Sequence, residues 1–363
     1  MSHPGFDFGR RSYHTLSPFS CPRRGYLSQM LQIRLGPGPT GWRGALNTGK
    51  LFHSLMELHY KRLLAKRKGR PYNRRFRLSG TDGQPLCKTT AEVVDYYASQ
   101  AYSEETLNHG LAAFKRYLFG WPEAKDPLAK QMIAVEKDIH GDLRALLPKD
   151  IAKDAPPLPY DAQYDGIAIA ESGKGVVSVE HKALAAFSGG TLFMYLNSGQ
   201  VVGQCAVWNS CADLVERYGP MDSVWINIAF KDGKPNRPVH RESLHIPRSW
   251  QREYAEALLA RTSDLEVTLQ AYDAAQKAAP AARRAAVGRA WPKHGMFNGE
   301  CVDLTRSCEF QRICFENDRV PDLYQITDAG RERAERDGLV RLESVGTYTN
   351  PNAAPQGGDA EAA

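Results

Sequence analysis

The chain has 363 residues and a mass of 40.4 kDa, which is long enough for one large domain or two modest ones. Hydrophobic residues make up 42% of it and charged residues 24%, the balance of an ordinary globular protein. No apolar run approaches the roughly 20 residues of a membrane-spanning helix, and the N-terminal sequence lacks the apolar centre of a secretion signal. We therefore predict a cytoplasmic protein without membrane contact.

Apolar periodicity predicts a helix-rich start, a block of strands and a helical end. In chain order, helices are predicted at 49–64, 91–119 and 127–134, and strands follow at 164–172 and 176–183. A helix at 199–218, strands at 223–231 and 241–246, and a helix at 249–278 complete the prediction. Strands that interleave with helices without a regular βαβ repeat indicate an α/β core with a central mixed sheet flanked by helices.

The net charge of +6 is unevenly spread. The segment from Lys61 to Arg77 has nine basic residues and no acidic one. Clustered lysine and arginine side chains bind nucleic acid by releasing the counterions condensed on its phosphates. The segment therefore predicts a phosphate-contacting surface, with a solvated helix face followed by a loop as the alternative.

The hairpin predicted from 164 to 183 carries three groups with a shared chemical use. Gly173 and Lys174 predict a two-residue turn. This register places Asp165 opposite Lys182, with Glu180 on the same face. Paired carboxylates suit Mg²⁺ or Mn²⁺, and an adjacent ammonium neutralises charge in a phosphoryl-transfer transition state. The alternative is an exposed hairpin with a cross-strand ion pair.

Asp165 followed by Glu180-His181-Lys182 resembles the D…(D/E)-x-K signature of the PD-(D/E)XK nucleases. The resemblance implies a restriction-endonuclease-like core that holds a divalent metal ion at this hairpin. It implies Asp165, Glu180 and the main-chain carbonyl of His181 as metal ligands. Lys182 would then position and activate the attacking water.

Two further motifs are similar to the RecB/AddB-like branch of that superfamily. Gly49-x-x-x-His53 lies in the first predicted helix, which implies His53 as a metal ligand; Glu57, one turn later, would orient His53 or bind metal through water. The branch also carries Q-x-x-x-Y on a helix behind the metal site. Gln200 with Gln204 in the tyrosine position, or Gln204 with Trp208 there, fits this motif, and we favour Gln200 as a contact to the nucleic-acid backbone.

The seven cysteines are an odd number in a chain without an export signal, which argues against a disulfide framework. Cys21 together with Cys301, Cys308 and Cys314 resembles the iron–sulfur staple of AddB-type and CRISPR-adaptation exonucleases, which implies a [4Fe–4S] cluster. Six residues rather than two separate the first two late cysteines. A tetrahedral zinc site and ordinary buried thiols are the alternatives.

We therefore predict one PD-(D/E)XK-type nuclease domain over 1–340, with a helical insertion at about 80–145, a Cys-rich C-terminal staple and a disordered tail at 341–363. The expected function is that of a Mg²⁺- or Mn²⁺-dependent DNA exonuclease in replication, recombination or repair. The predicted nucleic-acid contacts are Gln200, Arg23, Arg24, Lys66, Arg67 and Lys68. Glu136, just ahead of the hairpin, is placed on a neighbouring strand without an assigned role in the site.

Two other functions fit the same sequence. One is a non-catalytic nucleic-acid-binding protein with an iron–sulfur or zinc site. The other is the nuclease subunit of a helicase or recombination complex. The chain has no G-x-x-x-x-G-K-[ST] loop, so a partner would have to supply any ATP-driven motor.

Overall fold

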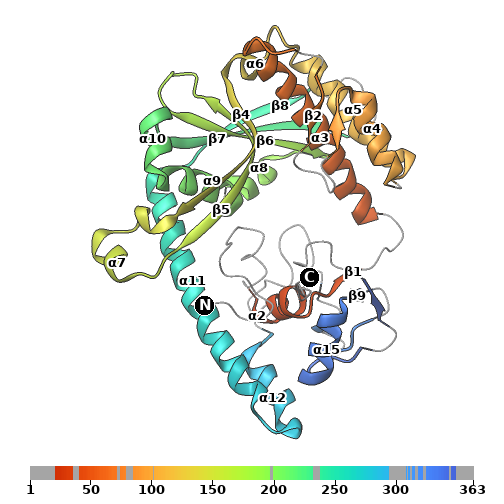
Figure 1. Cartoon of the computed structure of the whole chain (residues 1–363), viewed down its shortest axis with the longest axis vertical. Coiled ribbons are helices and arrows are strands. Elements are labelled where there is room, and N and C mark those ends of the chain that lie inside the picture. The colour runs from red at the N-terminus through yellow and green to blue at the C-terminus, as the bar shows by residue number, and fades with distance from the viewer. Residues whose placement is uncertain are drawn as a thin grey trace, which may run out of the picture. The chain divides into compact units, whose positions relative to one another are not determined.

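The computed structural model describes residues 21–35, 41–71, 74–78, 85–100, 102–196, 199–231, 238–293, 308, 310, 313–314, 318–321, 324–342 and 345–348. The contacts within the chain divide it into two compact units, where the sequence predicts one domain (Figure 1). The terminal unit comprises 1–9, 14–39 and 260–363, and the sheet unit comprises 10–13 and 40–259. All residues predicted for the metal site belong to the sheet unit.

The sheet unit is built on a five-stranded mixed sheet with the strand order β4-β5-β6-β7-β8 (Figure 1). The strands are β4 (Met132–Asp142), β5 (Pro159–Ile169), β6 (Val176–Leu184), β7 (Met221–Phe230) and β8 (His240–His245). Only β6 and β7 pair in parallel, and the other neighbours are antiparallel. Strand β6 is buried from Val176 to His181, as expected for a central strand covered on both faces. The structure thus confirms an α/β fold with a central mixed sheet flanked by helices.

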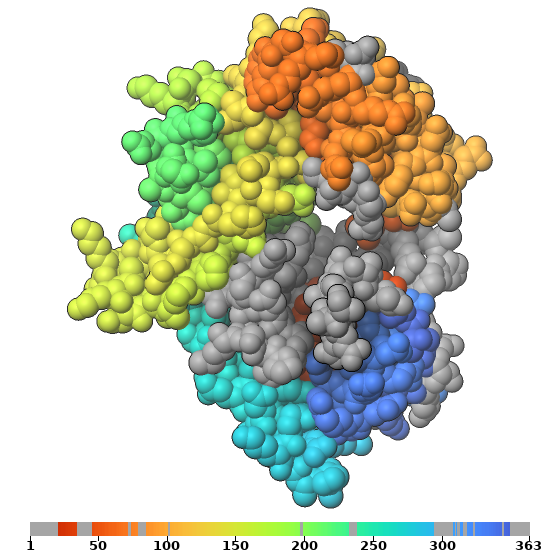
Figure 2. Space-filling model, viewed as in Figure 1, coloured from red at the N-terminus to blue at the C-terminus, as the bar shows by residue number. Residues whose placement is uncertain are grey.

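One face of the sheet is covered by helices that precede it in the chain. They are α3 (Gly41–Arg67), α4 (Thr90–Ser99), α5 (Glu104–Gly120) and α6 (Pro127–Gln131), and Figure 2 shows α3 to α5 as one continuous surface in orange. A side chain at Gly110 of α5 would meet Leu51 of α3 at 2.7 Å, so glycine lets these helices pack closely. Their apolar side chains share a buried core with Val177 and Val179 of β6.

The other face is covered by α9 (Gly199–Ser210), whose residues from Val201 to Trp208 are buried. Ser178 of β6 donates a hydrogen bond to Gln204 of this helix. Neighbouring side chains of a strand point to opposite faces, so α3 and α9 lie on opposite sides of the sheet. Shorter elements complete the sheet unit: β2 (Phe76–Arg77), β3 (Leu86–Cys87), a 3₁₀ turn (Leu143–Leu146), α7 (Lys149–Asp154), α8 (Gly189–Leu196) and α10 (Ala212–Tyr218).

The predicted hairpin forms between β5 and β6, but its register differs from the prediction by two residues. Ile167 pairs with Ser178, where the predicted two-residue turn would pair it with Glu180. The N–H of Ala170 donates to the carbonyl of Gly175, so a four-residue loop replaces the predicted turn. Gly175 has a φ of 82°, which glycine adopts without a steric penalty. Because the shift is an even number of residues, each side chain of β6 keeps its predicted face.

A second correction concerns the helical insertion predicted for about 80–145. Helix α6 ends at Gln131, and Met132–Asp142 forms β4 of the central sheet. The predicted helix over 127–134 therefore continues directly into a strand. Glu136 lies on the strand that pairs with β5, which agrees with its predicted place on a neighbouring strand.

The terminal unit packs around Tyr26, Tyr272 and Trp291, whose rings contact one another. It contains α2 (Pro22–Gly25), a π-helical turn (Tyr26–Met30), most of α11 (Arg248–Gln276), α12 (Pro280–Ala290), α15 (Asp328–Asp337) and a small sheet of β1 (Arg34–Leu35), β9 (Tyr324–Ile326) and β10 (Gly346–Thr347). In the part of the chain that the structure describes, no helix has the length and apolar character needed to span a membrane.

Candidate metal centre

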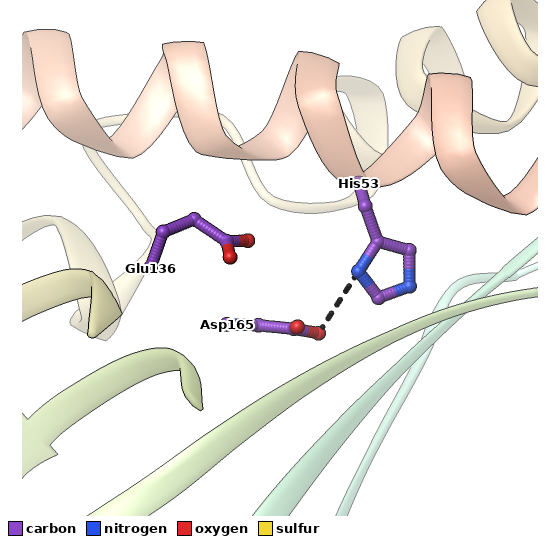
Figure 3. A group of neighbouring side chains, drawn as sticks. All are labelled: His53, Glu136 and Asp165. Carbon is purple, nitrogen blue, oxygen red and sulfur yellow. Dashed lines mark ion pairs between the residues drawn. The ribbon is translucent and has the colours of Figure 1, made fainter. Parts of the chain in front are cut away.

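Three side chains from three different elements converge in the sheet unit (Figure 3). His53 comes from α3, Glu136 from β4 and Asp165 from β5, and one potential ligand atom of each lies within 4.8 Å of the others. His53 Nδ1 is 3.2 Å from Asp165 Oδ2. Among the described residues this is the only such group of histidine, cysteine and carboxylate side chains. An imidazole with two carboxylates suits a divalent ion such as Mn²⁺ or Mg²⁺.

Strand pairing places Glu136 directly opposite Asp165, between the pairs Val135–Gly166 and Lys137–Tyr164. Glu136 has a φ of 47°, a left-handed conformation that is uncommon for a residue other than glycine. Such a residue costs on the order of 1–3 kcal/mol, and strain of this kind concentrates at functional sites. The strained backbone at Glu136 therefore gives this carboxylate a direction that an ordinary strand residue would not have.

The predicted pair Glu180 and Lys182 lies beside this group. Glu180 is 1% exposed and accepts hydrogen bonds from Lys182 Nζ at 2.8 Å, from Gln200 Nε2 at 3.3 Å and from Gln204 Nε2. With its oxygens held by these donors, Glu180 is not one of the three converging groups. The structure thus brings together the predicted ligands His53 and Asp165, and adds Glu136 where the sequence suggested Glu180.

The electrostatics of the centre are those of crowded carboxylates. Burial, and then the negative charges of Asp165 and Glu57, raise the pKa of Glu136 to about 10. Burial opposes ionisation of Asp165, but His53 and Lys182 hold its pKa well below the usual range. A divalent ion would relieve this repulsion, because it supplies the positive charge that the carboxylates lack.

The neighbouring carboxylates also shift the pKa values of His53 and Lys182. Burial lowers the pKa of His53, but the Asp165 carboxylate outweighs it and leaves that pKa raised. Burial likewise opposes the charged form of Lys182, yet Glu180 and Asp165 raise its pKa above the usual value. Lys182 is therefore a protonated donor at neutral pH. The side chain of His53 is 31% exposed, so the centre can be reached from solvent.

Glu57 and Lys61 follow His53 along α3. Glu57 is 2% exposed, and its Oε1 lies 2.5 Å from Lys61 Nζ. Its charge contributes to the raised pKa of Glu136, so it lies near that carboxylate. Lys61 Nζ also donates to the carbonyl of Arg77 at 2.8 Å, which connects α3 to β2.

His181 contributes its backbone and a buried ring. Its N–H donates to Asp165 Oδ2 at 2.8 Å, which orients that carboxylate. Its ring stacks on Tyr60, and its Nδ1 lies 3.2 Å from Asn227 Nδ2. Burial lowers the pKa of the ring to about 3, so the ring is neutral.

Helix α9 presents Gln200 and Gln204, one turn apart, to Glu180. Gln204 is the more buried, at 1% exposure, and it also donates to the carbonyl of Gln163 at 3.1 Å. Both glutamines of the Q-x-x-x-Q pattern therefore orient Glu180. We assign them positioning roles, with Gln204 the more strongly held.

The predicted phosphate contacts are unevenly placed. Lys68 and Lys61 line a pocket described below. Lys66 forms an ion pair of 2.7 Å with Glu123, and the Arg67 guanidinium donates to the carbonyls of Lys130 and Met132. The Arg67 contacts join α3 to the start of β4, which favours a structural role.

The four cysteines of the predicted staple are only partly described. Cys21 and Cys314 are buried in the terminal unit, Cys308 packs against the core that contains Cys314, and Cys301 lies outside the described residues. Cys21, Cys308 and Cys314 are not a three-ligand group among the described side chains. Burial, the largest cause, raises the pKa of Cys314 to about 12.

Two arginines predicted to contact phosphates lie beside these cysteines in the terminal unit. Arg23 is 4% exposed and donates to the carbonyl of Trp291 at 2.8 Å and to Asp318 at 2.5 Å. Its burial favours a structural role over the predicted phosphate contact. Arg24 is half-buried.

Sequence reasoning missed Glu136 as a member of the centre. The available signal was an acidic residue in IAVEKDI, a β-like stretch just ahead of the hairpin. A scan against protein-family models gives no match for this chain, and a search of curated proteins finds no significant similarity.

Proposed function

We propose that this chain is a divalent-metal-dependent DNA nuclease of the PD-(D/E)XK type, acting on phosphodiester bonds as an exonuclease. The observation that carries the proposal is the convergence of His53, Glu136 and Asp165 beside the ion pair of the buried Glu180 with Lys182. A bound Mg²⁺ or Mn²⁺ ion would polarise the phosphodiester and lower the pKa of a coordinated water.

The residues of the chain divide the remaining work. His53, Glu136 and Asp165 hold the metal, and the N–H of His181 orients Asp165. Lys182, positioned by Glu180, offers an ammonium that positions the attacking water and neutralises charge developing on the phosphate. Gln200 and Gln204 donate hydrogen bonds to Glu180 and keep it in place. Because Glu180 accepts a hydrogen bond from Lys182, the two glutamines also help to orient Lys182.

The test is cleavage of end-labelled linear DNA, and of circular DNA, by anaerobically purified protein with Mg²⁺ or Mn²⁺. We expect metal-dependent loss of linear DNA in the wild type and none in Glu136→Gln. Asp138→Asn is the matched control, because Asp138 is exposed on the same strand. Cutting of circles would change the activity to that of an endonuclease. Absence of cleavage with retained DNA binding would favour a binding module or a subunit that needs its helicase partner.

The terminal unit adds a second, separate part of the proposal. Cys21, Cys301, Cys308 and Cys314 would hold a [4Fe–4S] cluster, with zinc as the alternative. What supports this is that Cys314 lies in the buried core of the terminal unit with Cys308 packed against it, and that Cys21 is buried in the same unit. Iron, sulfide and zinc analysis of the anaerobically purified protein separates the two metals, and absence of all three refutes the staple.

A further inference from the structure

A strongly basic pocket of about 330 Å³ lies between the second half of α3 and the segment that leads into β2. We call it the basic pocket. Its ten lining residues include six cations and no carboxylate; the cations are Lys61, Lys68, Arg70, Arg74, Arg75 and Arg77. Two of them have ion-pair partners outside the lining, Glu57 for Lys61 and Glu92 for Arg75 at 4.0 Å. The pocket therefore has an excess of positive charge.

The basic pocket adjoins the metal centre through two of its own residues. Val135 lines the pocket and immediately precedes Glu136 on β4. Lys61 lines it as well, and its charge acts on Glu136. The pocket and the proposed metal site are therefore lined by consecutive residues of β4, Val135 and Glu136.

The shape and chemistry of the pocket fit a single nucleotide. Its volume is at the lower end of the range of small-ligand sites, about 300–1,000 Å³. Phe76 supplies an aromatic surface, and the Arg74 guanidinium lies 4.8 Å from the centre of that ring. Arginine forks bind phosphate oxygens in pairs, and an aromatic ring offers a stacking surface to a base or sugar.

The positive charge of the basic pocket favours a terminal phosphate over an internal one. A terminal phosphate monoester carries about −1.5 to −2 charges at neutral pH, whereas an internal phosphodiester carries one. A concave site with several cations and no carboxylate stabilises the more highly charged group further. The additional charge is present only at the end of a strand.

We propose that the basic pocket binds the terminal phosphate of a DNA strand, so that the neighbouring phosphodiester reaches the metal centre. The inference rests on the proposed nuclease function for its substrate. It adds that the enzyme recognises phosphorylated strand ends, with Arg70 and Arg74 as the main contacts.

The experiment measures binding of the full-length protein to short single-stranded DNA without divalent metal, so that no cleavage occurs. Three oligonucleotides of one sequence are compared by fluorescence anisotropy, with a 5′-phosphate, a 3′-phosphate or hydroxyls at both ends. We expect about tenfold tighter binding of one phosphorylated form, the value of one charge-assisted hydrogen bond. The preferred form identifies which end is bound.

The Arg70→Gln/Arg74→Gln variant should lose this preference while its circular dichroism spectrum is unchanged. The matched control is Arg217→Gln/Arg252→Gln, which removes two exposed arginines of the sheet unit outside the pocket and should keep the preference. Equal binding of all three oligonucleotides by the wild type, or a preference that survives in the pocket variant, overturns the proposal. Because the readout is binding, a protein that cuts nothing can still support the pocket. If the protein cleaves DNA but binds the three oligonucleotides equally, the proposal for the basic pocket is refuted and the proposed nuclease function is not.

Discussion

At the scale of single residues, the metal centre is decided by how each carboxylate is already occupied. Both oxygens of the buried Glu180 accept hydrogen bonds from Lys182, Gln200 and Gln204. Glu136 accepts a hydrogen bond from Gln163 at one oxygen, Oε2, and lies within ligand distance of His53 and Asp165. This difference is why we place Glu136, and not Glu180, in the ligand set.

Replacing Glu136 with glutamine should have different effects on metal-free and metal-bound protein. The metal-free variant should melt close to the wild-type temperature at neutral pH, because the raised pKa of Glu136 already keeps its side chain protonated and uncharged. Saturating Mn²⁺ should stabilise the wild type by about 2.7 kcal/mol at one hundred times its dissociation constant, and the variant hardly at all. Differential scanning calorimetry with and without Mn²⁺ measures both effects. Equal stabilisation of both proteins by Mn²⁺ would remove Glu136 from the ligand set.

Lys182 should matter for the chemical step rather than for metal binding. Lys182→Met is expected to lower the single-turnover cleavage rate by about 10²–10³-fold, the value of one positioned donor at a developing charge. Its Mn²⁺ affinity, measured by titration calorimetry, should be retained. Lys174→Met, in the exposed hairpin loop, is the control and should cleave normally. A Lys182→Met enzyme of normal rate contradicts the assigned role.

At the scale of elements, a buried polar network holds the helices of one face against the sheet. Asp126, at the start of α6, accepts a hydrogen bond from Tyr60 of α3 at 2.6 Å and pairs with Arg241 of β8 at 2.9 Å. Arg241 Nε donates to Asn227 of β7, which in turn contacts the ring of His181. The network thus extends from α6 to the backbone that orients Asp165.

Removing Asp126 should be strongly destabilising. Asp126→Ala leaves the mostly buried Arg241 without its carboxylate, which typically costs about 3–5 kcal/mol. Urea unfolding monitored by circular dichroism measures the change, with Asp150→Ala on the exposed surface of α7 as the control. A loss below about 1 kcal/mol, as for a surface ion pair, would show that the network contributes little.

At the scale of the whole molecule, the net charge of +6 favours a polyanionic partner, and the arginines of the basic pocket concentrate that charge beside the metal centre. A cation that contacts a phosphate releases counterions, so it contributes to the salt dependence of binding. If the proposed function holds, the distribution of charge, more than its total, would determine where DNA lies.

The salt dependence of DNA binding should report this distribution. Removing Arg70 and Arg74 should reduce the slope of log affinity against log salt by about two, because each phosphate-contacting cation contributes about one. Anisotropy titrations over a series of salt concentrations give the slope. The Arg217→Gln/Arg252→Gln protein should keep the wild-type slope, and an equal reduction in both variants would mean that the arginines act only through the overall charge.

Local patterns in the sequence were sufficient for the α/β class, the β5–β6 hairpin and the helix that carries His53. Each depends on the spacing of residues within one element, and that spacing fixes which side chains share a face. The same spacing put Asp165, Glu180 and Lys182 near one another even though the register was predicted two residues away. Side chains alternate between the two faces of a sheet along each strand, so a register shift by an even number of residues leaves every side chain on the same face.

Tertiary structure alone decided the rest. The sequence places Glu136 on a neighbouring strand, but its approach to Asp165 depends on the register in which β4 pairs with β5, and no local pattern specifies that register. The basic pocket likewise requires the segment 70–77 to return onto α3 beside Val135. Sequence spacing therefore determined which residues each element presents, and long-range packing determined which of those residues meet, because the free energy of such contacts depends on the whole fold and not on neighbouring positions.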